Sequence, residues 1–202
     1  MRYRAVLTFP AVALMLAQMS FATEKTLTLS PEETEVSFSL EATGENVLGS
    51  LQLTAGEIRF DPDSGEASGV IDLDAQAAAT GNRKRDKKMH AKVLESDQFS
   101  LIRFTPESIE GELAPSGPSD ITLHGTVTIL GKQHPWDLPA HVESDGTRLE
   151  IHSEAEVPYV EWGMHDPSIL ILRVAKVVNV SITAEGSLSG GDIDAQPASS
   201  SR

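Results

Sequence analysis

Residues 46–104 decide the fold, because the hydrophobic pattern changes twice within them. They open with Asn46-Val-Leu-Gly-Ser-Leu-Gln-Leu-Thr-Ala-Gly-Glu-Ile-Arg-Phe-Asp-Pro62 and continue with Ile71-Asp-Leu-Asp-Ala-Gln-Ala77, two segments that read as amphipathic strands. A charged stretch follows, Thr80-Gly-Asn-Arg-Lys-Arg-Asp-Lys-Lys-Met-His-Ala-Lys-Val-Leu-Glu-Ser-Asp97, before Ile102-Arg-Phe104 restores a strand. We therefore expect one charged helical segment inside a chain that is otherwise β.

Alternation with a period of two residues continues along the rest of the chain. Apolar residues occupy nearly every second position over 36–40, 121–129, 136–142, 149–157 and 178–184, and turn-forming residues separate these segments. About eight strands joined mostly by short turns predict an all-β protein, either an antiparallel sandwich or a barrel. Alternation alone does not separate a packed sandwich from a barrel wide enough to hold a ligand.

The charged stretch predicts one short helix over about residues 82–95. Asn82 can cap its start, while Met89, Val93 and Leu94 form an apolar stripe. Such a helix would lie over a barrel mouth, a ligand entrance or a sheet edge. Its charge run is either an ordinary solvated face or a positive rim at a ligand mouth. The basic residues of this run, which we call the basic segment, are Arg83, Lys84, Arg85, Lys87, Lys88 and Lys92.

Both ends of the chain differ in composition from its middle. Arg2 and Arg4 precede an apolar run that ends near small residues at Ser20-Phe-Ala22, so residues 1–22 are predicted to be a signal peptide. Gly, Ser, Asp and Pro dominate residues 187–202, which are predicted to be a disordered tail. One domain over residues 23–186 is left, in a protein that we expect to be periplasmic or secreted.

Composition and residue spacing argue against several functions. The formal net charge of −14 disfavours nucleic acid as a partner, and the absence of Cys excludes disulfides and thiolate chemistry. The histidines lie in different segments without a close metal-binding spacing, and there is no Gly-x-Ser-x-Gly motif. We therefore expect neither catalytic residues nor a metal site. His134 and His165, which lie in motif-like loops, are the pair to consider for the alternative of a metal-dependent enzyme.

An ordered series of motifs runs through nearly all of the expected domain. It contains Gly49-Ser-Leu51, Gly56-Glu-Ile-Arg-Phe-Asp-Pro62, Gly81-Asn-Arg-Lys-Arg-Asp86, Leu123-His-Gly-Thr-Val-Thr-Ile-Leu-Gly-Lys-Gln-His-Pro135 and Pro158-Tyr-Val-Glu-Trp-Gly-Met-His-Asp-Pro-Ser168. The series resembles the YceI-like family of exported, lipocalin-like polyisoprenoid-binding proteins. The resemblance implies an eight-stranded antiparallel barrel with the helix over one side. It also implies a long isoprenoid or other lipid chain inside the barrel.

In such a barrel the inward phase of the strands would line one elongated apolar pocket. The residues expected to line it are Phe38, Leu40, Leu51, Leu53, Ile71, Leu73, Leu123, Val127, Leu138, Ile151, Val180 and Ile182. A possible mouth of the pocket contains Arg85, Met89, Leu94, Trp162 and Met164.

The first functional expectation is a carrier, and not an enzyme. Its ligand would be an amphiphilic or isoprenoid lipid, such as a polyprenyl or quinone-like chain, and no cofactor is expected. Contact with a membrane surface would be at most transient, through the basic segment. Two alternatives stay open: an exported metal-dependent enzyme that uses histidines, and a ligand-free interaction module with a fully packed core.

Overall fold

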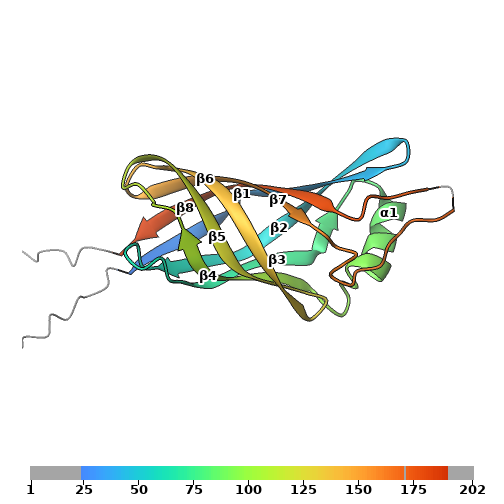
Figure 1. The fold of residues 1–202 in the computed structure, drawn as a ribbon. Helices are drawn as coiled ribbons and strands as arrows, with labels where there is room; N and C mark the ends of the chain where they lie inside the picture. Colours follow the sequence, from blue (N-terminus) through green and yellow to red (C-terminus); the bar gives the residue numbers. More distant parts are fainter. Residues whose placement is uncertain (1–23, 171, 191–202) are drawn as a thin grey trace, which may run out of the picture.

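The chain folds into a closed barrel of eight antiparallel strands. The computed structural model describes residues 24–170 and 172–190. Each strand pairs with its neighbour in sequence, and the last pairs back with the first (Figure 1). The strands are β1 (Lys25–Ala42), β2 (Glu45–Phe60), β3 (Ala67–Ala79), β4 (Leu101–Glu110), β5 (Gly117–Ile129), β6 (Lys132–Ser144), β7 (Arg148–Val157) and β8 (Val178–Ser189). The predicted all-β barrel is confirmed, and the sandwich is excluded.

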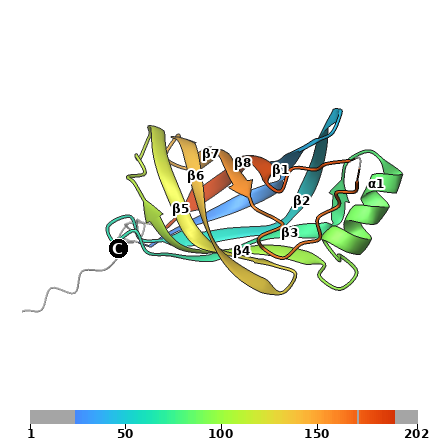
Figure 2. The same ribbon diagram turned by 45° about the vertical axis from the view of Figure 1, so that its right-hand side comes forward.

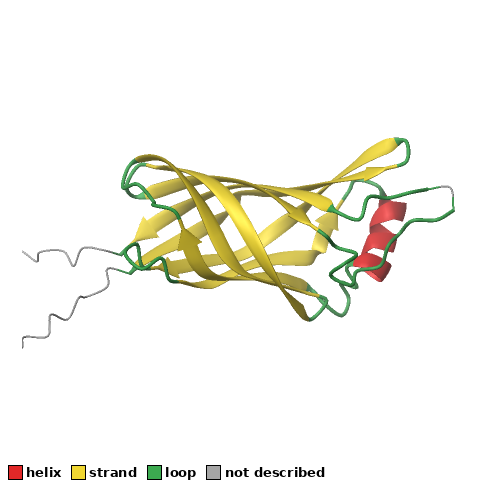
Figure 3. Ribbon diagram, viewed as in Figure 1, coloured by secondary structure: helices red, strands yellow, loops and turns green. Residues whose placement is uncertain are grey.

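A single helical segment lies across one end of the barrel. It consists of α1 (Arg83–Lys88) and a π-helical turn, η1 (Met89–Val93). Figures 1 and 2 both place α1 beside the segment that joins β7 to β8, and Figure 3 shows loops at this end around it. We call this the helix end. The start of β1 and the end of β8 lie at the opposite end, which we call the terminal end.

The predicted cap and helix position are confirmed. The Asn82 side chain accepts hydrogen bonds from the backbone N–H groups of Lys84 and Arg85, at 3.1 and 3.3 Å. The segment then widens into η1, in which Leu94 N donates to Met89 O at 2.9 Å. Val93 and Leu94 pack against the barrel core. The helix therefore turns its apolar stripe toward the barrel and its basic face toward solvent.

Side chains fill the terminal end of the barrel. Leu27, Leu29, Ile58 and Phe60 are all buried in one apolar cluster. Gly186 faces the same interior, where a Cβ atom would lie 2.6 Å from Leu27 Cδ1. Glycine at that inward position leaves room for the large leucine side chains of the adjacent strand. This half of the barrel is a packed core.

The boundaries of the domain differ in part from the predicted ones. Strand β1 begins at Lys25, eleven residues before the alternating segment that we identified at residues 36–40. Ser187–Ser189 belong to β8 and pair with Thr26–Thr28, so a tail that begins at residue 187 is wrong for these three residues. The predicted signal peptide and residues 191–202 lie outside the described residues. Among the described residues, no helix is long and apolar enough to cross a membrane.

Candidate functional site

The barrel wall has an opening between β6 and β7 at the helix end. Strand β6 pairs with β5 from Lys132 to Ser144, but it pairs with β7 only from Ala140 to Ser144. Pro135 and Pro139 lie in the part of β6 that β7 does not reach. Because proline has no N–H, it cannot donate to a strand ladder and is tolerated along an unpaired edge. The sequence of β6 therefore permits pairing on one side and leaves the other side open.

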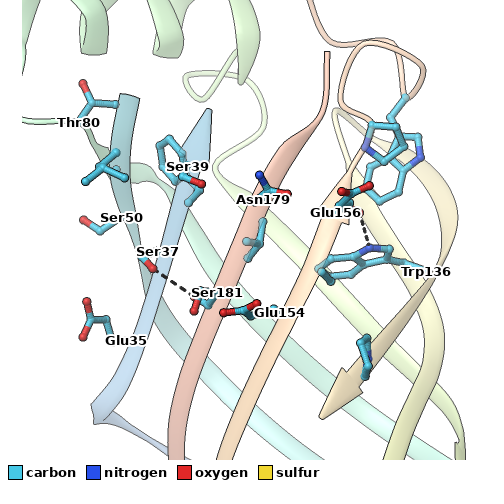
Figure 4. A pocket seen from close by; sticks show the side chains of 18 of the residues that line it. Glu35, Ser37, Ser39, Ser50, Thr80, Trp136, Glu154, Glu156, Asn179 and Ser181 are labelled. Atoms are coloured by element: carbon cyan, nitrogen blue, oxygen red, sulfur yellow. Dashed lines mark hydrogen bonds between the residues drawn. The ribbon is translucent and has the colours of Figure 1, made fainter. Parts of the chain in front are cut away.

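A pocket of about 1370 Å³ lies at this opening (Figure 4). Its apolar lining comes from inward-facing residues and both tryptophans, and its polar lining comes largely from the other face of the same strands. Several polar lining residues are exposed, so the pocket is open to solvent. The apolar residues include Phe38, Ala155, Val180, Trp136 and Trp162, and the polar ones include Glu35, Ser37, Ser39, Glu154, Glu156, Asn179 and Ser181.

An aromatic cluster forms one wall of the pocket. The rings of Trp136 and Trp162 meet edge to face, with centroids 6.2 Å apart, and Trp136 meets Phe104 in the same way at 6.1 Å. His134 stacks on Trp162 at 4.8 Å between centroids. Trp136 Nε1 donates to Glu156 O at 3.0 Å, a hydrogen bond that crosses from β6 to β7 where the strands do not pair. The wall is thus largely aromatic, which suits contact with hydrocarbon.

Phe38 lies against β2 inside the barrel because its partner there is a glycine. Phe38 pairs with Gly49, and a Cβ atom at Gly49 would overlap the Phe38 ring. The flat packing of the ring on Gly49 holds it along the wall. A side chain at position 49 would push the ring away from β2, so Gly49 helps to set the shape of the pocket.

Two buried polar atoms inside the barrel lack a hydrogen-bond partner among the described residues: His134 Nε2 and Ser153 Oγ. Ser153 is 7% exposed, and it pairs with Ile182 and Ala140 on the flanking strands. A buried polar atom without a partner costs free energy. Neither residue lines the pocket, so both atoms lie behind its wall.

The residues predicted to line a cavity divide between the core and the pocket. Phe38 and Val180 border the pocket. Leu51 is partly buried. Nine others form or pack against one apolar cluster: Leu40, Leu53, Ile71, Leu73, Leu123, Val127, Leu138, Ile151 and Ile182. Alternation in the sequence thus identified side chains that share one apolar interior. That all twelve of them line one elongated cavity stays a prediction.

The residues of the predicted mouth differ in their environments. Arg85 donates to Thr80 Oγ1 at 2.9 Å and to Glu45 Oε1 at 3.0 Å, which ties α1 to the β1–β2 turn. Trp162 borders the pocket, whereas Met164 is only 5% exposed and belongs to the core cluster. Met89 is partly buried, and Leu94 packs on the core. Sequence reasoning missed Trp136 as a pocket residue, although the two flanking prolines mark its strand as an edge.

The segment 158–177, which joins β7 to β8, is fastened to the helix end by hydrogen bonds. Tyr159 Oη donates to Ala175 O at 2.9 Å within the segment. Thr43 N donates to Arg173 O at 2.9 Å, and Ala175 N donates to Glu41 O at 2.8 Å. The segment therefore joins the β1–β2 hairpin and carries Trp162 to the pocket.

Tyr159 should make the stability of the barrel fall at alkaline pH. Burial, followed by the negative charge of Asp166, raises the pKa of Tyr159 to about 12, from 10.0 for a free side chain. The stability that comes from keeping this phenol neutral is fully present below pH 10 and is lost as the pH rises from 10 to about 12. Urea unfolding at several pH values measures the free energy of unfolding. Between pH 10 and about 12 it should fall less steeply for Tyr159→Phe than for the wild type. Equal slopes for the two proteins would contradict the prediction.

Other histidines of the described residues pair with acidic side chains or lie exposed. No group of three or more His, Cys, Asp or Glu in the described part of the chain is arranged to hold a metal ion. His124 contacts Asp137 and Glu110 at 2.7 and 3.2 Å, and these hydrogen bonds raise its pKa. His141 has a raised pKa for the same reason, with Asp120 as the main partner. These histidines form charge pairs on the outer face of the barrel, and His165 is exposed.

A closed eight-stranded antiparallel barrel with a helix across one end is a lipocalin-like fold. The YceI-like domain model matches residues 27–186. The chain therefore belongs to the YceI-like family, as its ordered motifs predicted. Among curated proteins, none matches the chain significantly.

Solved structures share the fold at low sequence identity. The chain is similar to BcnA of Burkholderia cenocepacia, with 17% identity and a TM-score of 0.64 over 78% of this chain and 98% of that one. It is also similar to a polyisoprenoid binding domain from Saccharophagus degradans implicated in plant cell wall breakdown, with 15% identity and a TM-score of 0.63 over 81% and 98% of the two chains. The YceI protein of Campylobacter jejuni has 15% identity and a TM-score of 0.51 over 93% and 98%.

Proposed function

We propose that the protein is an exported, non-enzymatic carrier that binds the hydrocarbon chain of a polyisoprenoid or similar long-chain lipid. The observation that carries the proposal is the pocket of about 1370 Å³ at the opening between β6 and β7. Phe38, Trp136, Trp162 and Val180 supply the apolar contacts that such a chain requires. Binding and release of an unchanged lipid need no reacting group, and the family resemblance supports binding over catalysis.

The polar part of the pocket favours a lipid with a neutral or cationic polar group. The lining includes the carboxylates of Glu35, Glu154 and Glu156, which repel a phosphate. Ser39, Asn179 and other polar residues beside them can bind a hydroxyl or carbonyl oxygen. A polyprenol or a quinone-like compound fits this combination better than a polyprenyl phosphate does.

Mass spectrometry of organic extracts tests the proposal directly. Protein purified without detergent from its own exported compartment should release one long-chain lipid in near-stoichiometric amount. The same sample should lack residues 1–22, because we propose that they are removed during export. A protein that releases no lipid, and whose pocket stays empty when a broad panel of lipids is offered, would be an interaction module instead.

Removal of the ligand should lower the melting temperature. A ligand that binds only the folded state adds RT ln(1 + [L]/Kd) to the free energy of unfolding, about 2.7 kcal/mol at a hundredfold excess over Kd. Scanning calorimetry of delipidated protein should therefore show a lower midpoint that long-chain polyprenols restore. Short polyprenols of the same head group are the control, because they bury less apolar surface. An unchanged midpoint across the panel would count against a carrier.

A further inference from the structure

Three aliphatic side chains at the helix end are exposed to solvent. In the segment between β7 and β8, Ile169 is 63% exposed, Leu170 98% and Leu172 36%. Backbone hydrogen bonds join Ile169 and Leu172 in both directions, at 2.9 and 3.1 Å. We call Ile169, Leu170 and Leu172 the apolar tip. Neighbouring exposed aliphatic side chains of this kind mark a surface that contacts a partner.

Backbone contacts attach the residues next to the apolar tip to the β1–β2 hairpin. Next to it, Arg173 donates through its backbone N to Thr43 Oγ1 at 3.0 Å, and its carbonyl accepts from Thr43 N. Val174 pairs with Ala42 of β1. The tip is therefore presented by backbone contacts with the β1–β2 hairpin.

Positive charge accompanies the apolar tip at the same end of the barrel. Figures 1 and 2 show the β7–β8 segment running beside α1, which carries most of the basic segment. Among the described residues, Arg85 is paired with Glu45, whereas the other five basic residues of the segment are exposed and form no ion pair. Arg173, beside the tip, is also exposed. A basic segment beside an aliphatic tip is unusual in a chain of net charge −14.

We propose that the helix end docks on an anionic lipid bilayer. The apolar tip enters the boundary between headgroups and acyl chains, and the basic segment contacts lipid phosphates. Interfacial binding strength comes from buried apolar area together with attraction to anionic lipids, and the helix end supplies both. Glu161 and Asp166 lie in the same β7–β8 segment and oppose this attraction, so docking is reversible. Docking goes beyond the proposed carrier function and turns the helix end of the barrel, with its pocket, toward the membrane.

Site-specific labelling tests this orientation, because the chain has no Cys of its own. An environment-sensitive fluorophore is attached to Leu170→Cys and, as the matched control, to Ser116→Cys in the exposed β4–β5 turn at the terminal end. On vesicles of phosphatidylglycerol and phosphatidylethanolamine, the label at position 170 should shift to the blue and the label at position 116 should not. Vesicles of phosphatidylcholine alone should shift neither label.

Vesicle sedimentation of unlabelled protein measures separately how much the apolar tip and the basic segment contribute to membrane binding. Ile169→Ser with Leu170→Ser should weaken binding at least tenfold, because burial of one large aliphatic side chain changes an equilibrium constant by about ten- to a hundredfold. Lys84→Gln, Lys87→Gln and Lys88→Gln should each weaken it about fivefold at low salt, and wild-type binding should fall as salt rises. Melting curves should stay unchanged, since these side chains are exposed.

Three outcomes would overturn docking: no binding to anionic vesicles, equal shifts of both labels, or a wild-type dimer in solution that the tip variants dissociate. The last would identify a second copy of the chain as the partner. The vesicles contain no isoprenoid, and bound lipid is measured on a separate sample. A protein that docks but carries no lipid contradicts the carrier function alone, whereas a protein that carries lipid but does not dock contradicts this inference alone.

Discussion

Val180→Trp is expected to weaken lipid binding at least a hundredfold while the barrel stays folded. Val180 faces inward on β8, pairs with Phe38 and Ala155 on the two flanking strands, and lines the pocket. An indole at this position would occupy the space that the hydrocarbon chain needs. A hundredfold loss corresponds to about 2.7 kcal/mol of binding free energy. Titration of delipidated protein with a polyprenol, together with mass spectrometry of retained lipid, measures the change.

The control for this variant is Thr183→Trp on the outward face of the same strand. Thr183 is exposed and does not line the pocket, so the same large side chain should leave lipid binding unchanged there. The melting temperature of delipidated Val180→Trp should stay close to that of the delipidated wild type, because the added ring enters open space. Normal lipid retention in Val180→Trp would place the ligand elsewhere.

Gly125→Val should lower the free energy of unfolding by about 3 kcal/mol or more, since forced overpacking of a core is destabilising. Gly125 faces the barrel interior on β5, between Pro106 of β4 and Trp136 of β6. A Cβ atom there would lie 2.6 Å from Phe104 Cζ and would overlap the backbone oxygen of Thr105. The Phe104 ring already contacts Trp136, and the backbone oxygen of Thr105 cannot move without displacing β4.

Urea unfolding measures the loss of unfolding free energy in Gly125→Val. The control is Thr128→Val, at a position of β5 that faces outward. That nearly isosteric change should alter the free energy of unfolding by less than about 0.5 kcal/mol. The aromatic cluster should also be disturbed in Gly125→Val, because Phe104 contacts Trp136 edge to face. A variant that unfolds like the wild type would show that β4 and β5 can separate without cost.

The strands and the helix could be predicted from the sequence, because each follows from a local pattern. The first part of β1 was missed, although Thr26-Leu-Thr-Leu29 alternates. An irregularity in pairing between Thr28 and Val36 changes the phase, so that Leu27 and Leu29 are buried at odd positions and Val36 at an even one. A single alternating pattern cannot continue across such a bulge. Closure of the barrel depends on pairing between β1 and β8, which no local pattern encodes.

The inward-facing residues could be predicted, but the location of the pocket could not. Alternation predicts which side chains face the barrel interior. It does not predict where these side chains leave a cavity unfilled. Here the space arises where β7 stops pairing with β6, and where Trp136 and Trp162 meet across that opening. Both depend on strand register and on contacts between distant segments. Pro135 and Pro139 were the local signal in the sequence.

The opening between β6 and β7 also bears on the solubility of the protein. An unpaired strand edge offers free backbone donors and acceptors to other chains, and it is a common starting point for β-aggregation. Pro135 and Pro139 remove two donors from β6, while Glu154 and Glu156 place negative charges beside the facing edge of β7. Proline and charge are the devices by which natural sheets keep their edges from pairing with a neighbour. The barrel can therefore keep a permanently open wall at high concentration without recruiting strands from other molecules.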